Sequence, residues 1–137
     1  MVDNWRVKAA ADSLNVGRER LRSAELLADA GQSRDAISRA YYAVPAAAHG
    51  CLSARGVRAH SHAGTIRHFS LLFIQTGIVP REYGRAFARI EGERMDADYE
   101  MSKQFTAEDA RVVLDIARRF VAMVEVILPK SLQEEQE

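Results

Sequence analysis

Apolar residues recur at intervals of three and four along most of the chain, and no stretch alternates apolar and polar residues with a period of two. Spacing of three and four gathers side chains on one face of an α-helix, whereas a half-buried strand requires strict alternation. These patterns predict an all-α fold, an antiparallel four-helix bundle with an additional helix, about five helices in total. The clearest stripe consists of Val113, Ile116, Phe120, Val124 and Ile127.

Glycine and proline residues divide this pattern into segments. Glycine commonly closes a helix, and proline fits a helix best in its first turn. Helix ends are therefore expected near Gly31, Gly56 and Gly77. A fourth helix is expected to begin at Pro80, and the last helix to end at Pro129.

Local side chains suggest how two of these helices begin and where one is disturbed. Ser33 is placed to cap the second helix, and Thr106 with Asp109 three positions later approximates a capping box for the last one. Pro45 lies inside the second helix, where it lacks an amide proton and clashes with the preceding turn. A kink or local break is expected there, costing about 3 kcal/mol unless it is compensated.

Length and charge limit the classes of protein that the chain can represent. Its 137 residues suit one domain, expected over residues 1–129, followed by a polar and frayed tail at 130–137. Nineteen basic and nineteen acidic side chains cancel, so any affinity for phosphate must be local. A single cysteine and no secretion signal favour the cytoplasm, and no run approaches the ~18 apolar residues of a membrane-spanning helix.

The run from Ser38 to His49 reads Ser-Arg-Ala-Tyr-Tyr-Ala-Val-Pro-Ala-Ala-Ala-His. It resembles the signature of the HEPN family of small all-helical domains, in which Ser-Arg-Ala-Tyr-Tyr-Ala is followed by two apolar residues and a histidine. Here Ala46 occupies the position of that histidine. Further matches to the family, in the same order within residues 5–128, are His62-Ala63-Gly64-Thr65-Ile66, Phe69, Phe73, Thr76-Gly77, Pro80 and Arg94-Met95-Asp96-Ala97-Asp98-Tyr99.

The resemblance implies RNA cleavage without a metal or other cofactor, in which the histidine moves protons at the ribose 2′-hydroxyl and Arg39 steadies the phosphate. Positions 39 and 46 share a helix face, because seven steps of about 100° return almost to the start. Alanine cannot transfer a proton, so Arg39 is a catalytic candidate without its partner. His49 is the nearest substitute, but it lies about 80° off that face and ~15 Å along the axis.

Five residues are candidates for ligand binding, and most have a structural alternative. Arg39 can instead pair with Asp35, and Arg94 with Asp98, because both pairs are four residues apart. Tyr41 and Tyr42 point to different sides of their helix, so one belongs to the core and the other can contact a ligand. The helical period alone does not decide which tyrosine belongs to the core, although Tyr41 shares an apolar stripe with Ile37 and Val44. The candidates are Arg39, Tyr42, Arg94, Asp98 and Tyr99.

Three histidines follow the second helix, and their pattern does not predict a metal site. His62 and His68 are spaced wrongly for one helical face, and neither a carboxylate nor a cysteine completes a tetrahedral set with His60.

The same helix, residues 33–55, offers a broad strip of small residues where another backbone can approach closely. We expect it to form a homodimer interface, as the resemblance implies, and packing within one chain is the alternative. The strip consists of Ala43, Ala46, Ala47, Gly50 and Ala54.

Three functions are compatible with these observations. The preferred one is a non-catalytic or weakly active module that binds RNA, a nucleotide or a partner protein, because the motif histidine is replaced by Ala46. The first alternative, implied by the resemblance, is an endoribonuclease toxin whose antitoxin partner is a small nucleotidyltransferase. The second alternative is a purely structural helical adaptor.

Overall fold

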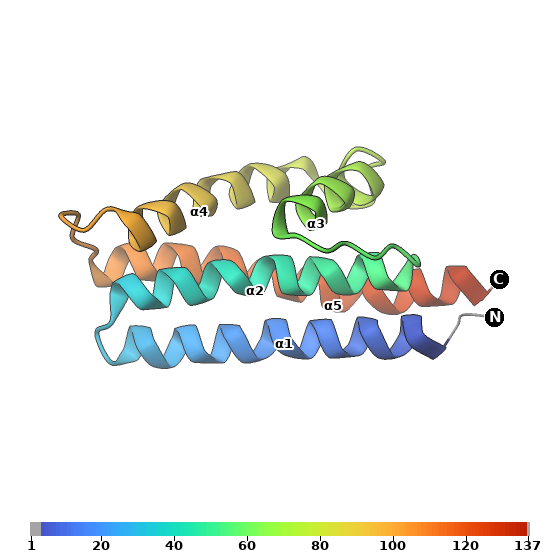
Figure 1. Cartoon of the computed structure of the whole chain (residues 1–137), viewed down its shortest axis with the longest axis horizontal. Helices are drawn as coiled ribbons and strands as arrows, with labels where there is room; N and C mark the ends of the chain where they lie inside the picture. The colour runs from blue at the N-terminus through green and yellow to red at the C-terminus, as the bar shows by residue number, and fades with distance from the viewer. Residues whose placement is uncertain (1–3, 137) are drawn as a thin grey trace.

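The computed structural model describes the backbone of residues 4–136 and the side chains of residues 4–130. Five α-helices and one π-helical turn make up this part of the chain, without a strand (Figure 1). The predicted all-α fold is therefore confirmed. The elements are α1 (Asn4–Asp29), α2 (Ser33–Ala54), α3 (His62–Phe69), the π-helical turn η1 (Ser70–Ile74), α4 (Arg81–Tyr99) and α5 (Ala107–Gln136).

Four long helices run alternately up and down, and the short α3 with η1 lies on the connection between α2 and α4 (Figure 1). Helix α2 is the centre of the bundle, since it packs against α1, α3, α4 and α5, whereas α1 and α4 do not touch within the described residues. Fourteen of its 22 residues are buried. A helix enclosed in this way can present only a narrow strip of surface to a ligand.

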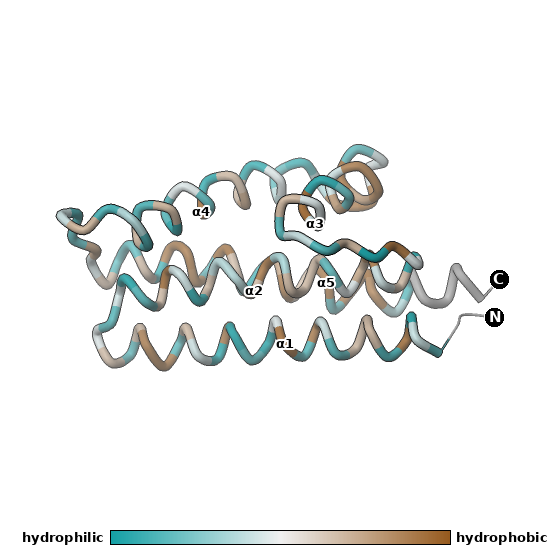
Figure 2. Tube along the Cα trace, viewed as in Figure 1, coloured by the Kyte–Doolittle hydropathy of each residue, from teal (hydrophilic) through white to brown (hydrophobic). Residues whose placement is uncertain are grey.

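The core is built from the apolar faces that the sequence pattern predicted. Short hydrophobic and hydrophilic runs follow one another along each helix (Figure 2), and the buried hydrophobic side chains form one core cluster. Burial of these faces supplies most of the favourable free energy of a helical bundle. The largest fully buried side chains include Phe69, Phe73, Ile37, Leu52 and Ile90.

Helices α1 and α2 approach closely through small residues. A Cβ atom added to Gly17 would stand 3.2 Å from the carbonyl oxygen of Ala43 and 3.3 Å from the amide nitrogen of Ala47. A Cβ atom on Gly50 would stand 3.1 Å from the carbonyl oxygen of Ala10. Ala43, Ala47 and Gly50 of the small-residue strip thus pack on α1 in the same chain. Packing within one chain, the alternative for this strip, accounts for these residues; of the strip only Ala46 is partly open to solvent, and a homodimer through α2 stays a prediction.

Several predicted helix ends are confirmed by backbone geometry. Gly31, Gly56 and Gly77 have φ values of 80°, 77° and 84°, which side chains with a Cβ atom rarely adopt. The capping box is also present: the amide of Thr106 donates to Asp109 Oδ2 at 2.9 Å, and the amide of Asp109 donates to Thr106 Oγ1 at 3.1 Å.

Three local predictions need correction. Ser33 does not cap α2, because it is the first helical residue and Gln32 holds the cap position without a side-chain hydrogen bond. Of the kink or local break expected at Pro45, the break is absent, since helix α2 continues through this buried residue and is supported by four neighbours. Helix α5 continues past Pro129 to Gln136, because residue 129 is exposed and the carbonyl of Glu125, which it leaves unbonded, can reach water.

The connection between α4 and α5 is tied to the start of α2 by Arg34. One guanidinium nitrogen, Nη1, donates to the carbonyl oxygens of Ala97 at 2.7 Å and Glu100 at 3.1 Å, and Nη2 donates to the carbonyl oxygen of Lys103. The guanidinium also lies 5.0 Å from the ring centre of Phe105. These contacts satisfy carbonyl groups at the end of α4 and hold its last turns beside the first turns of α2. No helix in the described part of the chain is long and apolar enough to cross a membrane.

Candidate functional site

One face of α2 stays open along most of the helix, and we call it the open stripe. Its members follow one another at helical spacing, so they lie in a single row between α1 on one side and α3 and α4 on the other. All other residues of α2 beyond its first two are buried. The open stripe consists of Asp35, Ser38, Arg39, Tyr42, Ala46 and His49.

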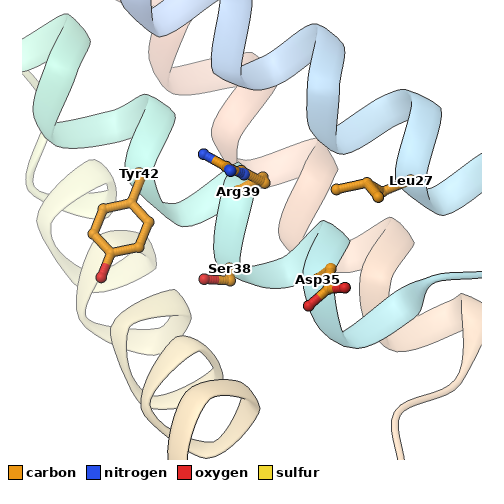
Figure 3. Close-up of a pocket in the computed structure, with 5 residues that line it drawn as sticks. All are labelled: Leu27, Asp35, Ser38, Arg39 and Tyr42. Carbon is orange, nitrogen blue, oxygen red and sulfur yellow. The ribbon is translucent and has the colours of Figure 1, made fainter.

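Arg39 lines a pocket of about 420 Å³ on the open stripe, which we call the Arg39 pocket (Figure 3). Its other lining residues are Leu27 of α1 and Asp35, Ser38 and Tyr42 of α2. The guanidinium makes no hydrogen bond or ion pair within the described residues. The expected ion pair with Asp35 is therefore absent, and both side chains are exposed. A guanidinium that is exposed and unpaired is available to a phosphate group.

Tyr41 and Tyr42 divide the roles that the sequence left open. Tyr41 is 3% exposed and belongs to the core, whereas Tyr42 is half-buried on the open stripe. The two rings meet edge to face, with centroids 5.1 Å apart. Burial raises the pKa of Tyr41 above its ordinary value, although Arg94 beside it opposes that effect. Tyr42 is accordingly the tyrosine that can contact a ligand.

Arg94 and Asp98 support these tyrosines from α4. The Arg94 guanidinium carbon lies 4.6 Å from the ring centre of Tyr41 and 5.7 Å from that of Tyr42. Its Nη1 atom is 3.5 Å from Asp98 Oδ2, so the predicted ion pair is formed, with side chains 13% and 25% exposed. Burial alone lowers the pKa of Arg94, but the two tyrosines and Asp98 outweigh burial and raise it. Arg94 thus stays charged beside the rings of both tyrosines.

Tyr99 lies in the last turn of α4 and is 66% exposed. Because Arg34 fixes the end of α4 beside the start of α2, Tyr99 lies near the end of the bundle that also holds Arg39. No ring contact joins Tyr99 to the other candidate residues within the described part of the chain. The structure thus brings Arg94, paired with Asp98, to Tyr42, whereas Tyr99 makes no such contact within the described residues.

A second pocket of about 190 Å³ surrounds Ala46, and we call it the Ala46 pocket. Pro45, Ala46 and Ala59 line it together with basic and imidazole side chains from α1, α2, the loop after α2 and α3. Sequence reasoning missed this pocket, since Arg20 lies on α1 and carries no motif. The basic and imidazole residues that line the pocket are Arg20, His49, His60 and His62.

His49 is held by hydrogen bonds on both sides of its ring. Nε2 lies 3.2 Å from the carbonyl oxygen of Ala59, and Nδ1 lies 3.2 Å from Ser13 Oγ and 3.4 Å from Ser53 Oγ. A carbonyl can only accept, so Nε2 carries a proton and donates it to Ala59, and in the neutral ring Nδ1 accepts from a serine hydroxyl. Since α2 is not broken at Pro45, nothing turns His49 toward Arg39. The arrangement favours a role in joining α1, α2 and the loop after α2 over proton transfer.

His62 connects the two pockets. It is the first residue of α3, after Ser61, whose Oγ accepts a hydrogen bond from the amide of Gly64 at 2.9 Å. The His62 ring meets the Tyr42 ring edge to face, with centroids 5.4 Å apart. Tyr42 therefore lines the Arg39 pocket and also touches a residue of the Ala46 pocket. Across the described residues, no group of three or more histidine, cysteine, aspartate or glutamate side chains is arranged to hold a metal ion.

Known proteins resemble this chain over most of its length. A sequence profile of the HEPN domain matches residues 10–127. The "Putative toxin MJ0605" of Methanocaldococcus jannaschii is 32% identical over 119 residues, which cover 87% of this chain and 88% of that protein. A UPF0332 protein of Thermotoga maritima is 27% identical over 93% of this chain and 91% of its own length. The crystal structure of TT1696 from Thermus thermophilus has a TM-score of 0.73 at 26% identity, covering 85% of this chain and 95% of that one.

Proposed function

The chain belongs to the HEPN domain family, and on that premise we propose that it binds RNA through the open stripe of α2 and cleaves RNA weakly or not at all. Family membership rests on the match over residues 10–127. The observation that carries the proposal is the state of Arg39, which is exposed and makes no hydrogen bond or ion pair within the described residues. Tyr42 beside it offers an aromatic ring on which a base can stack.

The weak or absent cleavage follows from Ala46. Helix α2 is continuous from Ser33 to Ala54, so residues 39 and 46 lie about 20° apart around the axis and ~10 Å apart along it. The position that faces the same groove as Arg39 therefore carries a methyl group. Proton transfer by a positioned side chain contributes typically 10²–10⁴-fold to a rate, whereas phosphate stabilisation by arginine does not depend on it. Binding should persist where cleavage is lost.

The test measures binding of a fluorescent single-stranded RNA to Arg39→Gln. Loss of a charge-assisted hydrogen bond costs about 1.5–3 kcal/mol, so we expect binding to weaken roughly 10- to 100-fold. The slope of log K against log salt should fall by about 0.7, the value for one phosphate on a single strand. Arg22→Gln is the matched control, because Arg22 is exposed on α1 and lines neither pocket on the open stripe. Equal affinities for the two variants would refute the proposal.

A second candidate function is that of an endoribonuclease toxin with a nucleotidyltransferase antitoxin. The name of the Methanocaldococcus jannaschii relative favours it, since that protein is called a toxin. This reading predicts cleavage of RNA in the presence of a chelator, at some pH from 5 to 9, that disappears in Arg39→Gln. Binding without cleavage over that whole range supports the first proposal instead. A nucleotidyltransferase that co-purifies with the chain would add support to the toxin reading.

Two copies of the chain are proposed to pair with their open stripes facing each other. The open stripe is the surface of α2 left for such a contact, because Ala43, Ala47 and Gly50 of the small-residue strip pack on α1. Pairing would place Tyr42 and Arg39 of both copies at one groove. Light scattering tests this pairing: the wild-type protein should have the mass of a dimer, and Tyr42→Arg the mass of a monomer.

An adaptor role, by contrast, predicts that changes at Arg39, Arg94 and Asp98 alter stability and leave RNA affinity unchanged.

A further inference from the structure

We propose that the Ala46 pocket is a second phosphate site, which holds a phosphate of the same RNA strand whose neighbouring phosphate binds Arg39. This inference rests on the proposed function and assigns a role to Arg20, His60 and His62, three residues that the RNA-binding proposal above does not use. The phosphate could equally belong to a free nucleotide, and the experiment below separates these sources.

The charge of the Ala46 pocket points to an anion. Arg20, His60 and His62 line it, and none of its lining residues is an aspartate or a glutamate. The three side chains make no hydrogen bond or ion pair within the described residues. Arg20 is half-buried, and both histidines are exposed. Convergence of unpaired donors without a carboxylate suits a phosphate.

The shape of the pocket depends on the absence of the motif histidine. Ala46 and Pro45 line it with small apolar groups, and the cavity has a volume of about 190 Å³. His49 closes one wall, and its Nε2 bond to the carbonyl of Ala59 holds the loop that carries His60. A larger side chain at position 46 would project into this space. Replacement of histidine by alanine thus removes a proton-transfer group and at the same time opens room for a ligand group.

The spacing of the two pockets fits one strand. Arg39 and Ala46 lie two helical turns apart, about 10 Å along α2, so the two pockets are placed to hold successive groups of one strand. Tyr42 lies between them and touches His62, so the aromatic pair separates the pockets at a place where a base could stack. The order along the groove is therefore a phosphate at Arg39, a base over Tyr42 and a second phosphate at Arg20, His60 and His62.

The test compares three ligands with wild-type protein, Arg20→Gln and the double variant His60→Gln/His62→Gln. The ligands are a fluorescent single-stranded RNA, a mononucleotide and inorganic phosphate, the last two measured by competition. Arg22→Gln and Arg67→Gln are controls, since both arginines are exposed and line neither pocket on the open stripe. Circular dichroism and the melting temperature establish that each variant is folded.

We expect Arg20→Gln to weaken RNA binding about 10-fold and to lower the salt slope by about 0.7, and the double histidine variant to weaken binding by a similar factor. Mononucleotide affinity should change much less, because Arg39 alone can hold its phosphate. If mononucleotide and RNA weaken equally, the site exists but takes a free nucleotide, and the strand assignment is wrong. If both pocket variants bind RNA as the controls do while Arg39→Gln is weakened, this inference fails and the proposed function stands. If Arg39→Gln also binds like wild type, both fail.

Discussion

Replacing Ala46 by histidine should create or strongly raise RNA cleavage. The new side chain would extend from the open stripe into a cavity of about 190 Å³, so it needs no displacement of the core. It would lie on the face of α2 that carries Arg39, about 20° away around the axis. The backbone between the two positions is continuous through Pro45, so this geometry is fixed in the folded chain.

The magnitude follows from the chemistry that the imidazole supplies. General acid–base catalysis typically contributes 10²–10⁴-fold, which corresponds to about 2.7–5.4 kcal/mol of activation free energy. The assay follows cleavage of a doubly labelled RNA in the presence of a chelator from pH 5 to 9. Because the exposed guanidinium of Arg39 is the proposed phosphate ligand, Arg39→Gln in the same chain should abolish most of the gain.

Two variants serve as controls for this prediction. Ala46→Gln adds a side chain of similar length that cannot transfer a proton at neutral pH, and it should leave the rate unchanged. His49→Gln in the Ala46→His background tests whether the neighbouring histidine contributes. An unchanged rate in a folded Ala46→His variant, over the whole pH range, would refute the argument that residues 39 and 46 form the two halves of one catalytic pair.

Three further predictions concern stability. In urea titrations, Gly50→Ala should have a free energy of unfolding roughly 1 kcal/mol or more below that of Gly92→Ala. The reason is that a Cβ atom at Gly50 meets the backbone of α1 at 3.1 Å, whereas one at Gly92 meets nothing within 4 Å. Equal values for the two variants would contradict the close packing of α1 on α2. His49→Leu should lower the free energy of unfolding by about 1–3 kcal/mol, because the Ala59 carbonyl and two serine hydroxyls lose their ring partner. The RNA affinity of this variant should match that of the wild type. A variant of full stability that binds RNA more weakly would show instead that His49 contacts the ligand. Burial raises the pKa of Cys51 from 9.0 to about 12, so the folded state keeps the proton longer than the unfolded state. Stability should then be fully present below pH 9 and fall by up to about 1.4 kcal/mol per pH unit between pH 9 and 12; a slope that persists unchanged in Cys51→Ala would show that other groups cause it.

Features that depend on short stretches of chain were predictable from the sequence. The helical spacing, the ends at Gly31, Gly56 and Gly77, and the capping box of α5 are set by residues within a few positions of one another. The pairing of Arg94 with Asp98 is local in the same way, because both lie on one helix four positions apart. The break expected at Pro45 and the helix end expected at Pro129 are absent, because tertiary support or solvent access overrode a local preference.

By itself, then, the sequence determined that the chain is a bundle of helices and that Arg39 and Ala46 share a face of one of them, because helical periodicity fixes both. It could not determine which side of α2 remains open, since that depends on α1 covering the small residues Ala43, Ala47 and Gly50. Only the tertiary structure brought Arg20 of α1 and His62 of α3 to Ala46. The physical reason is that these contacts join segments distant in sequence, and packing of the whole bundle selects them.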